Sequence, residues 1–258
     1  MGFFSSLFGK SAKKKEGEKQ FILKVNELID NPDENGSEQL ALIRQNYDLS
    51  KLDCEKIVHD HFKTVVESKL DDDRIDDTEY NHILQVGVAL GVDVMKVKDV
   101  ARTAWIKHAI WDVEENNTMP GYSDEVEIAL KSGEVIYHGT GAILKKEKTR
   151  TERINYSGPV VSFRICKSVT YRSGSMKMQS QKVAYIDSID QGTLYLTNKR
   201  IAFIGAKKNF SYPYDKIMRV EVSDVGLVIH KENLANPQIV ELNDYELVLV
   251  ILSKIFNN

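Results

Sequence analysis

Two groups of cationic side chains are the residues of this 258-residue chain best suited to bind an anionic partner. Lysine and arginine contact phosphate and carboxylate groups through charge-assisted hydrogen bonds. The first group follows a short aromatic segment and consists of Lys10, Lys13, Lys14 and Lys15. The second lies within residues 145–182, where ten basic side chains accompany two acidic ones. Its candidate residues for contact with phosphate or an acidic partner are Lys145, Lys146, Lys148, Arg150, Arg153, Arg164, Lys167 and Arg172.

The first eight residues form a hydrophobic wedge if they are helical. Their large apolar side chains are Phe3, Phe4, Leu7 and Phe8. At 100° per residue these four side chains lie within an arc of about 140°. An aromatic wedge followed by a polybasic run is typical of an interfacial membrane anchor, in which attraction to anionic lipid adds to apolar burial. The same pattern also fits a tail that docks onto its own protein or onto a partner.

Charge is unevenly distributed along the chain, although the net charge is only −3. Residues 1–19 carry five lysines and two glutamates, whereas residues 20–125 carry 23 acidic and 11 basic side chains. Such asymmetry indicates an anionic partner for the basic parts, or contact between the two halves of the chain. Lipid phosphate, an acidic protein and a plainly solvated hairpin all remain open for the basic segment, and nucleic acid is disfavoured.

The sequence carries no motif for catalysis or for a cofactor. It lacks a Gly-x-Ser-x-Gly elbow, a P-loop and a His-Glu-x-x-His pair, so we predict a non-enzymatic protein without cofactor or metal. The acidic run 71–79 departs from EF-hand spacing and is predicted to cap a helix. Cys54 and Cys166 lie in apolar periodic runs, which favours small buried side chains in a reducing compartment. The Gly139-Thr140-Gly141 tripeptide is predicted to be a turn.

The N-terminal half has helical periodicity over residues 20–115. Ser50 with Asp53, and Asp76 with Glu79, have the spacing of helix-opening caps, and Gly91 is placed to end a helix. A further helix is expected at residues 21–29. Another is expected to begin at about residue 37, and the last is expected to end at about residue 111. The small, charged segment 9–19 is predicted to be a linker that separates the first eight residues from the rest.

From about residue 132 the period changes to two, which predicts short antiparallel strands. The expected strands are 134–139, 141–147, 160–166, 168–172, 182–187, 192–197, 200–205, 208–212, 217–222, 225–230 and 238–242. The apolar run 244–256 is long enough for a buried C-terminal helix. We therefore predict an α+β protein in which an N-terminal all-α domain (20–115) precedes a small β-barrel domain (125–258) that the terminal helix caps.

The strand-rich half also resembles a known family. The resemblance is carried by residues 192–205 (GTLYLTNKRIAFIG), 210–213 (FSYP) and 215–217 (DKI). Supporting segments are 133–135 (GEV), 164–165 (RI) and 225–229 (VGLVI). Together they are similar to bacterial GRAM-like, pleckstrin-homology-like (PH-like) domains, and they imply a PH-like barrel over 125–258 of a kind that binds lipid phosphates or proteins. The tetrapeptide 197–200 is expected to be a hairpin connection.

The helical half is similar to TerB-like domains of tellurite-resistance proteins. This resemblance covers residues 37–112 and is carried by 73–79 (DRIDDTE) and 89–91 (ALG). The combined features predict a bacterial or phage adaptor that is cytoplasmic and associates peripherally with the inner face of the membrane or with a membrane-bound partner. The alternative is a soluble interaction or self-assembly module, including a homo-oligomer, without direct lipid binding.

Overall fold

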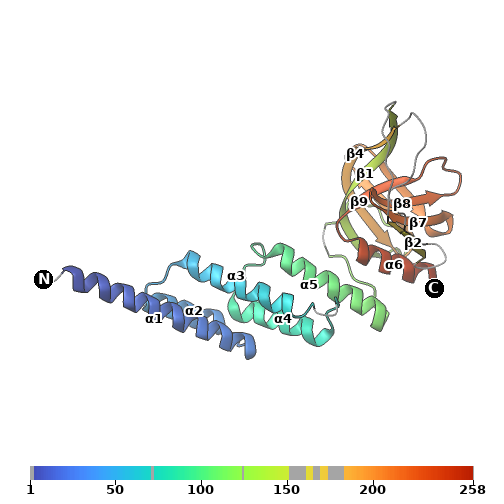
Figure 1. Cartoon of the computed structure of the whole chain (residues 1–258). Helices are drawn as coiled ribbons and strands as arrows, with labels where there is room; N and C mark the ends of the chain where they lie inside the picture. Colours follow the sequence, from blue (N-terminus) through green and yellow to red (C-terminus); the bar gives the residue numbers. More distant parts are fainter. Residues whose placement is uncertain are drawn as a thin grey trace. The chain divides into compact units, whose positions relative to one another are not determined.

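The computed structural model describes residues 3–70, 73–123, 125–150, 161–164, 169–173 and 183–257, with side chains described over 12–70, 73–123, 125–147 and 186–257. The chain divides into two units, each with its own packing. We call residues 1–111 the helical unit and residues 112–258 the β unit (Figure 1). The predicted α+β class, with helices first and a curved sheet second, is confirmed.

The helical unit is built from amphipathic helices around one apolar core. Its helices are α1 (Phe3–Asp30), α2 (Gly36–Asn46), α3 (Lys51–Ser68), α4 (Asp77–Leu90) and α5 (Lys98–Trp111). The core takes Phe21, Val25 and Leu28 from α1 and packs them against buried residues of α2, α3 and α4, including Leu40 and Phe62. Within the described residues, no helix of either unit is both long and apolar enough to span a membrane.

Local side-chain signals set the helix ends, as the sequence predicts. Ser50 Oγ accepts a hydrogen bond from the Asp53 backbone N–H at 3.4 Å, which opens α3. Asp76 and Glu79 form a reciprocal capping box at the start of α4, with the Glu79 N–H donating to Asp76 at 2.8 Å. Gly91 ends α4 in the left-handed conformation, at φ +63°. These three predictions are confirmed.

The linker predicted over residues 9–19 is wrong, because this segment is part of the continuous helix α1. Alanine, lysine and glutamate are strong helix formers even where no apolar face is present. Gln20 donates a hydrogen bond to Glu16 one turn earlier, at 2.8 Å. Gly17 is buried against Tyr47, so this stretch of α1 packs on the rest of the unit.

Two glycine substitutions in the helical unit are expected to have opposite effects. A Cβ at Gly17 would lie 2.3 Å from Tyr47 Cβ, so Gly17→Ala must displace α1 and is expected to lower the unfolding free energy by about 1–2 kcal/mol. A Cβ at Gly87 would lie 3.4 Å from the Phe62 ring, an ordinary contact. Gly87→Ala is therefore expected to raise the unfolding free energy by about 0.5–1 kcal/mol, because alanine has the higher helix propensity.

Urea denaturation followed by tryptophan fluorescence checks both changes, because Trp105 and Trp111 lie on α5. A Gly17→Ala variant as stable as the parent would show that α1 does not pack on Tyr47 in solution.

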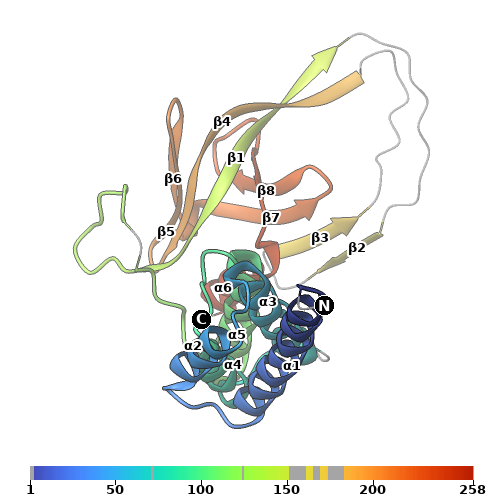
Figure 2. The ribbon, with the colours of Figure 1, turned by 90° about the vertical axis from the view of Figure 1, so that its left-hand side faces the viewer.

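The β unit is a single curled sheet followed by a helix (Figure 2). It begins with the short π-helix η1 (Asp112–Asn116). The strands are β1 (Ile136–Arg150), β2 (Val161–Arg164), β3 (Val169–Ser173), β4 (Val183–Thr197), β5 (Arg200–Gly205), β6 (Asn209–Pro213), β7 (Ile217–Ser223), β8 (Gly226–Lys231) and β9 (Gln238–Leu242). The order is β2-β3-β7-β8-β9-β1-β4-β5-β6, and only the β3–β7 pair is parallel among the described strands. The 3-10 turn η2 (Tyr214–Lys216) precedes β7.

The long strands β1 and β4 pair in antiparallel fashion and extend past their neighbours (Figure 2). The turn predicted at Gly139-Thr140-Gly141 is wrong, because β1 runs straight through it. Tyr122 lies over Gly139, where a Cβ would come within 2.5 Å of its ring, so glycine permits a close packing contact here and not a turn. Beyond Lys145, β4 is the only partner of β1 among the described strands.

The C-terminal helix α6 (Tyr245–Asn257) is confirmed at the predicted position. Its residues Leu247, Val248, Ile251 and Leu252 are buried, together with the inward-facing residues of β4 and β8 such as Leu194. The curled sheet is thus a half-barrel that α6 caps, as the barrel prediction requires.

Candidate functional site

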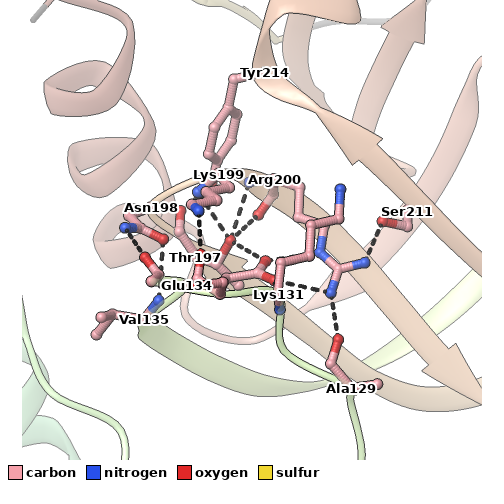
Figure 3. Close-up of polar contacts among 12 residues, drawn as sticks. Ala129, Lys131, Glu134, Val135, Thr197, Asn198, Lys199, Arg200, Ser211 and Tyr214 are labelled. Carbon is pink, nitrogen blue, oxygen red and sulfur yellow. Dashed lines mark hydrogen bonds and ion pairs between the residues drawn. The ribbon is translucent and has the colours of Figure 1, made fainter.

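The most connected polar cluster of the β unit surrounds the turn between β4 and β5, which confirms the hairpin predicted at 197–200 (Figure 3). Thr197 Oγ1 accepts the backbone N–H groups of Lys199 and Arg200, each at 3.0 Å. The same hydroxyl donates to Glu134 Oε1 at 2.8 Å. Tyr214 donates its hydroxyl proton to the Thr197 carbonyl at 2.8 Å. Threonine fits here because one hydroxyl closes the turn and also donates.

A bidentate ion pair forms the centre of this cluster. Arg200 Nε and Nη2 lie 2.7 and 3.1 Å from the two carboxylate oxygens of Glu134. The Glu134 side chain is fully buried, and that of Arg200 is 11% exposed. Burial alone would raise the pKa of Glu134, but hydrogen bonds from Arg200, the Lys131 N–H and Thr197 outweigh it and lower this pKa to about 2.

The remaining contacts of the turn hold the chain that precedes β1. Asn198 accepts from the Val135 N–H and donates to the Gly133 carbonyl, both at 3.0 Å. Lys199 donates to the Ser132 carbonyl, and Arg200 donates to the Ala129 carbonyl at 2.6 Å. The polar groups of residues 197–200 therefore bind the protein's own chain and hold it in place (Figure 3).

The anchored chain covers the outer face of the sheet, and we call residues 117–135 the strap. Ile128 and Tyr122 of the strap pack on a small outer core that includes Tyr195 and Ala202. The Tyr122 and Tyr195 rings meet edge to face, with centroids 5.8 Å apart. In the part of the strap that the structure describes, these contacts hold the chain on the sheet.

A second buried polar cluster joins β1 to the start of α6. His138 Nε2 lies 2.6 Å from one carboxylate oxygen of Asp244, and Thr140 Oγ1 donates to the other at 2.7 Å. The side chains of His138 and Asp244 are 3% and 0% exposed. A buried His–Asp pair has the composition of a catalytic dyad, but a group that catalyses must be open to a substrate. These residues instead fix the helix against the sheet.

The predicted basic segment is distributed over the sheet. Lys145 forms an ion pair with Glu241 at 2.5 Å, and the neighbouring Lys146 is exposed. Lys148 and Arg150 lie on the end of β1 that extends past β9, while Arg164 and Arg172 lie on β2 and β3. Three strands separate β3 from β1 in the sheet order. Arg153 and Lys167 lie outside the described residues.

The predicted membrane-contact residues all belong to α1. The backbone is helical from Phe3, which provides the 100° periodicity that the apolar arc of Phe3, Phe4, Leu7 and Phe8 requires. Lys13, Lys14 and Lys15 are exposed. The ammonium group of Lys13 lies 6.0 Å from the centroid of the Tyr47 ring, at the outer limit of a cation–π contact.

The described residues of the acidic run 71–79 make structural contacts within the helical unit. Asp76 and Glu79 cap α4, and Asp73 forms an ion pair with Lys107 at 2.7 Å. Over the described part of the chain, no three His, Cys, Asp or Glu side chains are grouped so as to hold a metal ion. Cys54 is buried as predicted, and burial raises its pKa although nearby Arg44 opposes this. Cys166 falls outside the described residues.

Open spaces of the structure were not predicted from the sequence, because they are assembled from distant segments, and two of them are lined by charged side chains. One, of about 940 Å³, lies on the β unit between residues 188–193 and the β5–β6 turn, with Glu127 at its side. Asp190 at its edge already accepts the N–H groups of Lys207 and Lys208 at 2.7 and 2.6 Å. The other, of about 190 Å³, lies among the helices of the helical unit.

Comparison with known proteins places no further constraint on the site, since no family model and no curated protein matches this chain.

Proposed function

We propose that the protein is a non-enzymatic adaptor that attaches peripherally to an anionic membrane surface through the first part of α1. The observation that supports this proposal is the continuity of α1 from Phe3 into the helical core. The apolar arc and the lysine run therefore lie on one helix, which does not have to fold at the membrane. Each lysine near anionic lipid contributes about 1 kcal/mol, which adds to apolar burial.

The β unit supplies a second, weaker contact in this proposal. Its similarity to GRAM-like, PH-like domains and the exposed Lys146 favour attachment to phosphate or to an acidic partner at the extended part of the β1–β4 pair. The helical unit, similar to TerB-like domains, then presents its acidic surface to a further protein on the cytoplasmic side. Two weak contacts on one chain raise the overall affinity without either being strong.

Liposome co-sedimentation of the full-length chain tests the anchor. Point substitutions are preferred over deletion of residues 1–19, because deletion also removes Gly17 from its contact with Tyr47. The variant Phe3→Ser/Phe4→Ser/Phe8→Ser is expected to lose at least about tenfold in apparent affinity for anionic vesicles, since three aromatic side chains are withdrawn from lipid. The matched control is Leu23→Ser, which alters a residue of α1 that is 52% exposed and lies outside the arc.

The lysine contribution is tested in the same assay. Lys13→Gln/Lys14→Gln/Lys15→Gln should weaken binding to anionic vesicles at low salt, whereas three exposed lysines elsewhere, Lys19, Lys56 and Lys98, provide a charge-matched control. Full-length protein that stays in the supernatant with every vesicle would refute the anchor. Salt-dependent self-association without lipid binding would then favour the soluble interaction module.

A further inference from the structure

The 190 Å³ cavity of the helical unit lies where α1, α2, α3 and the end of α4 meet. Its floor is apolar and includes the buried side chains of Phe21, Leu40 and Val58. Arg44 and His59 line it as half-buried residues. A space that combines an apolar floor with a few polar groups has the composition of a small-ligand site.

Charges around the cavity leave one cation uncompensated. Glu55 is paired with Lys96 at 2.7 Å and with Lys51 at 3.7 Å, and Asp93 lies 3.9 Å from Lys96. Both acidic groups of the lining are thus neutralised by lysines. The guanidinium of Arg44, by contrast, has no hydrogen-bonding or ion-pairing partner among the residues that the structure describes.

A half-buried guanidinium without a partner favours an anion. Removing a charge from water is unfavourable unless an opposite charge or hydrogen bonds replace the water. The planar guanidinium matches a carboxylate through two parallel hydrogen bonds, which makes carboxylate binding the favoured use of Arg44. The apolar floor beside Arg44 suits a hydrocarbon chain. A small inorganic anion would bury none of this apolar surface.

We propose that this cavity binds a short-chain monocarboxylate, with the carboxylate on Arg44 and the hydrocarbon chain on Phe21, Leu40 and Val58. The size supports this class of ligand, because a cavity of about 150 Å³ accommodates benzene and one of 190 Å³ is only slightly larger. The site is independent of the proposed membrane anchor, since none of its residues belongs to the apolar arc or to the lysine run.

Titration of the full-length protein with sodium hexanoate, followed by amide NMR shifts, tests the site. Saturable shifts are expected at Cys54, Val58 and Leu90, which line the cavity. Acetate, which lacks the chain, and 1-hexanol, which lacks the charge, should each bind at least about tenfold more weakly. Titration with inorganic phosphate is the further control. Phosphate should bind more weakly than hexanoate at a carboxylate site with an apolar floor, and as tightly at a general anion site.

Substitution of the arginine supplies the decisive comparison. Arg44→Met keeps most of the apolar stem and is expected to weaken hexanoate binding about tenfold or more. Arg44→Lys keeps the positive charge and is expected to retain part of the hexanoate affinity. Arg102→Gln on α5 changes an exposed arginine and should leave binding unchanged.

Three results would overturn the proposal. These are the absence of saturable shifts up to about 10 mM hexanoate, equal affinity of Arg44→Met and the parent, and phosphate binding as tight as hexanoate. If Arg44→Met does not fold, Ala41→Leu narrows the cavity and should weaken hexanoate more than acetate. Equal weakening of both would likewise contradict the proposed chain site.

Discussion

Arg200→Met is expected to lower the unfolding free energy of the β unit by about 3–5 kcal/mol. The substitution leaves the carboxylate of Glu134 fully buried without the guanidinium that neutralises it, and an uncompensated buried charge costs about this much. It also releases the Ala129 carbonyl and Ser211 Oγ from their donor. Hydrogen exchange of the buried β4 amides, Leu194 to Leu196, measures the change because these amides exchange through global opening.

The double variant Glu134→Leu/Arg200→Met is the matched control. Removing both charges together leaves no buried ion, so we expect most of the lost stability to return. Equal destabilisation of the single and double variants would mean that the two side chains stabilise the β unit by packing and not by charge compensation. Tryptophan fluorescence should be unaffected in both, since Trp105 and Trp111 belong to the helical unit.

Acid titration gives an independent signature of the same pair. Because the folded pKa of Glu134 is about 2 and lies below its ordinary value of 4.5, its contribution to stability is fully present above about pH 5. That contribution is lost as the pH falls from 4.5 towards 2, where the folded state also takes up the proton. A Glu134→Gln variant should lack this part of the acid dependence.

The second large effect is expected at the start of α6. Asp244→Ala removes the acceptor of both Thr140 and His138 in a fully buried position, and we expect a loss of about 3 kcal/mol in the β unit. Asp244→Asn keeps one acceptor oxygen and should lower the unfolding free energy by less than Asp244→Ala does. Thr140→Val, which removes a single hydroxyl donor, is expected to cost about 1 kcal/mol.

Hydrogen exchange of the α6 amides distinguishes a local from a global effect of Asp244→Ala. If the buried cluster fixes the helix on the sheet, protection of Leu247 to Leu252 should fall at least as far as that of β4. A variant with parental protection in α6 would show that the apolar face of α6 is sufficient to hold it.

Features that depend on a few neighbouring residues were predictable from the sequence. The caps at Ser50 and Asp76 and the αL glycine at Gly91 involve partners only three or four positions away, so their spacing carries the signal. The turn at 197–200 and the terminal helix are also local in origin. Strand periodicity located most of the β unit for the same reason.

Features that depend on distant partners were not predictable. Gly139 reads as a turn residue unless Tyr122 is known to lie over it, and Gly17 reads as part of a linker unless Tyr47 is known to pack on it. Glu134 meets Arg200 across 66 positions, so its burial has no local signal. The cavity beside Arg44 has residues from four helices and exists only once they pack.

The strap also determines where the β unit begins. Residues that precede a folded domain commonly form a flexible tether. In this protein η1 packs on α6 from Asp112 onward, Tyr122 and Ile128 pack on the sheet, and Arg200 holds Glu134. The β unit therefore begins at Asp112 and not at β1, so a fragment that starts at Ile136 would lack contacts that hold the outer face of the sheet.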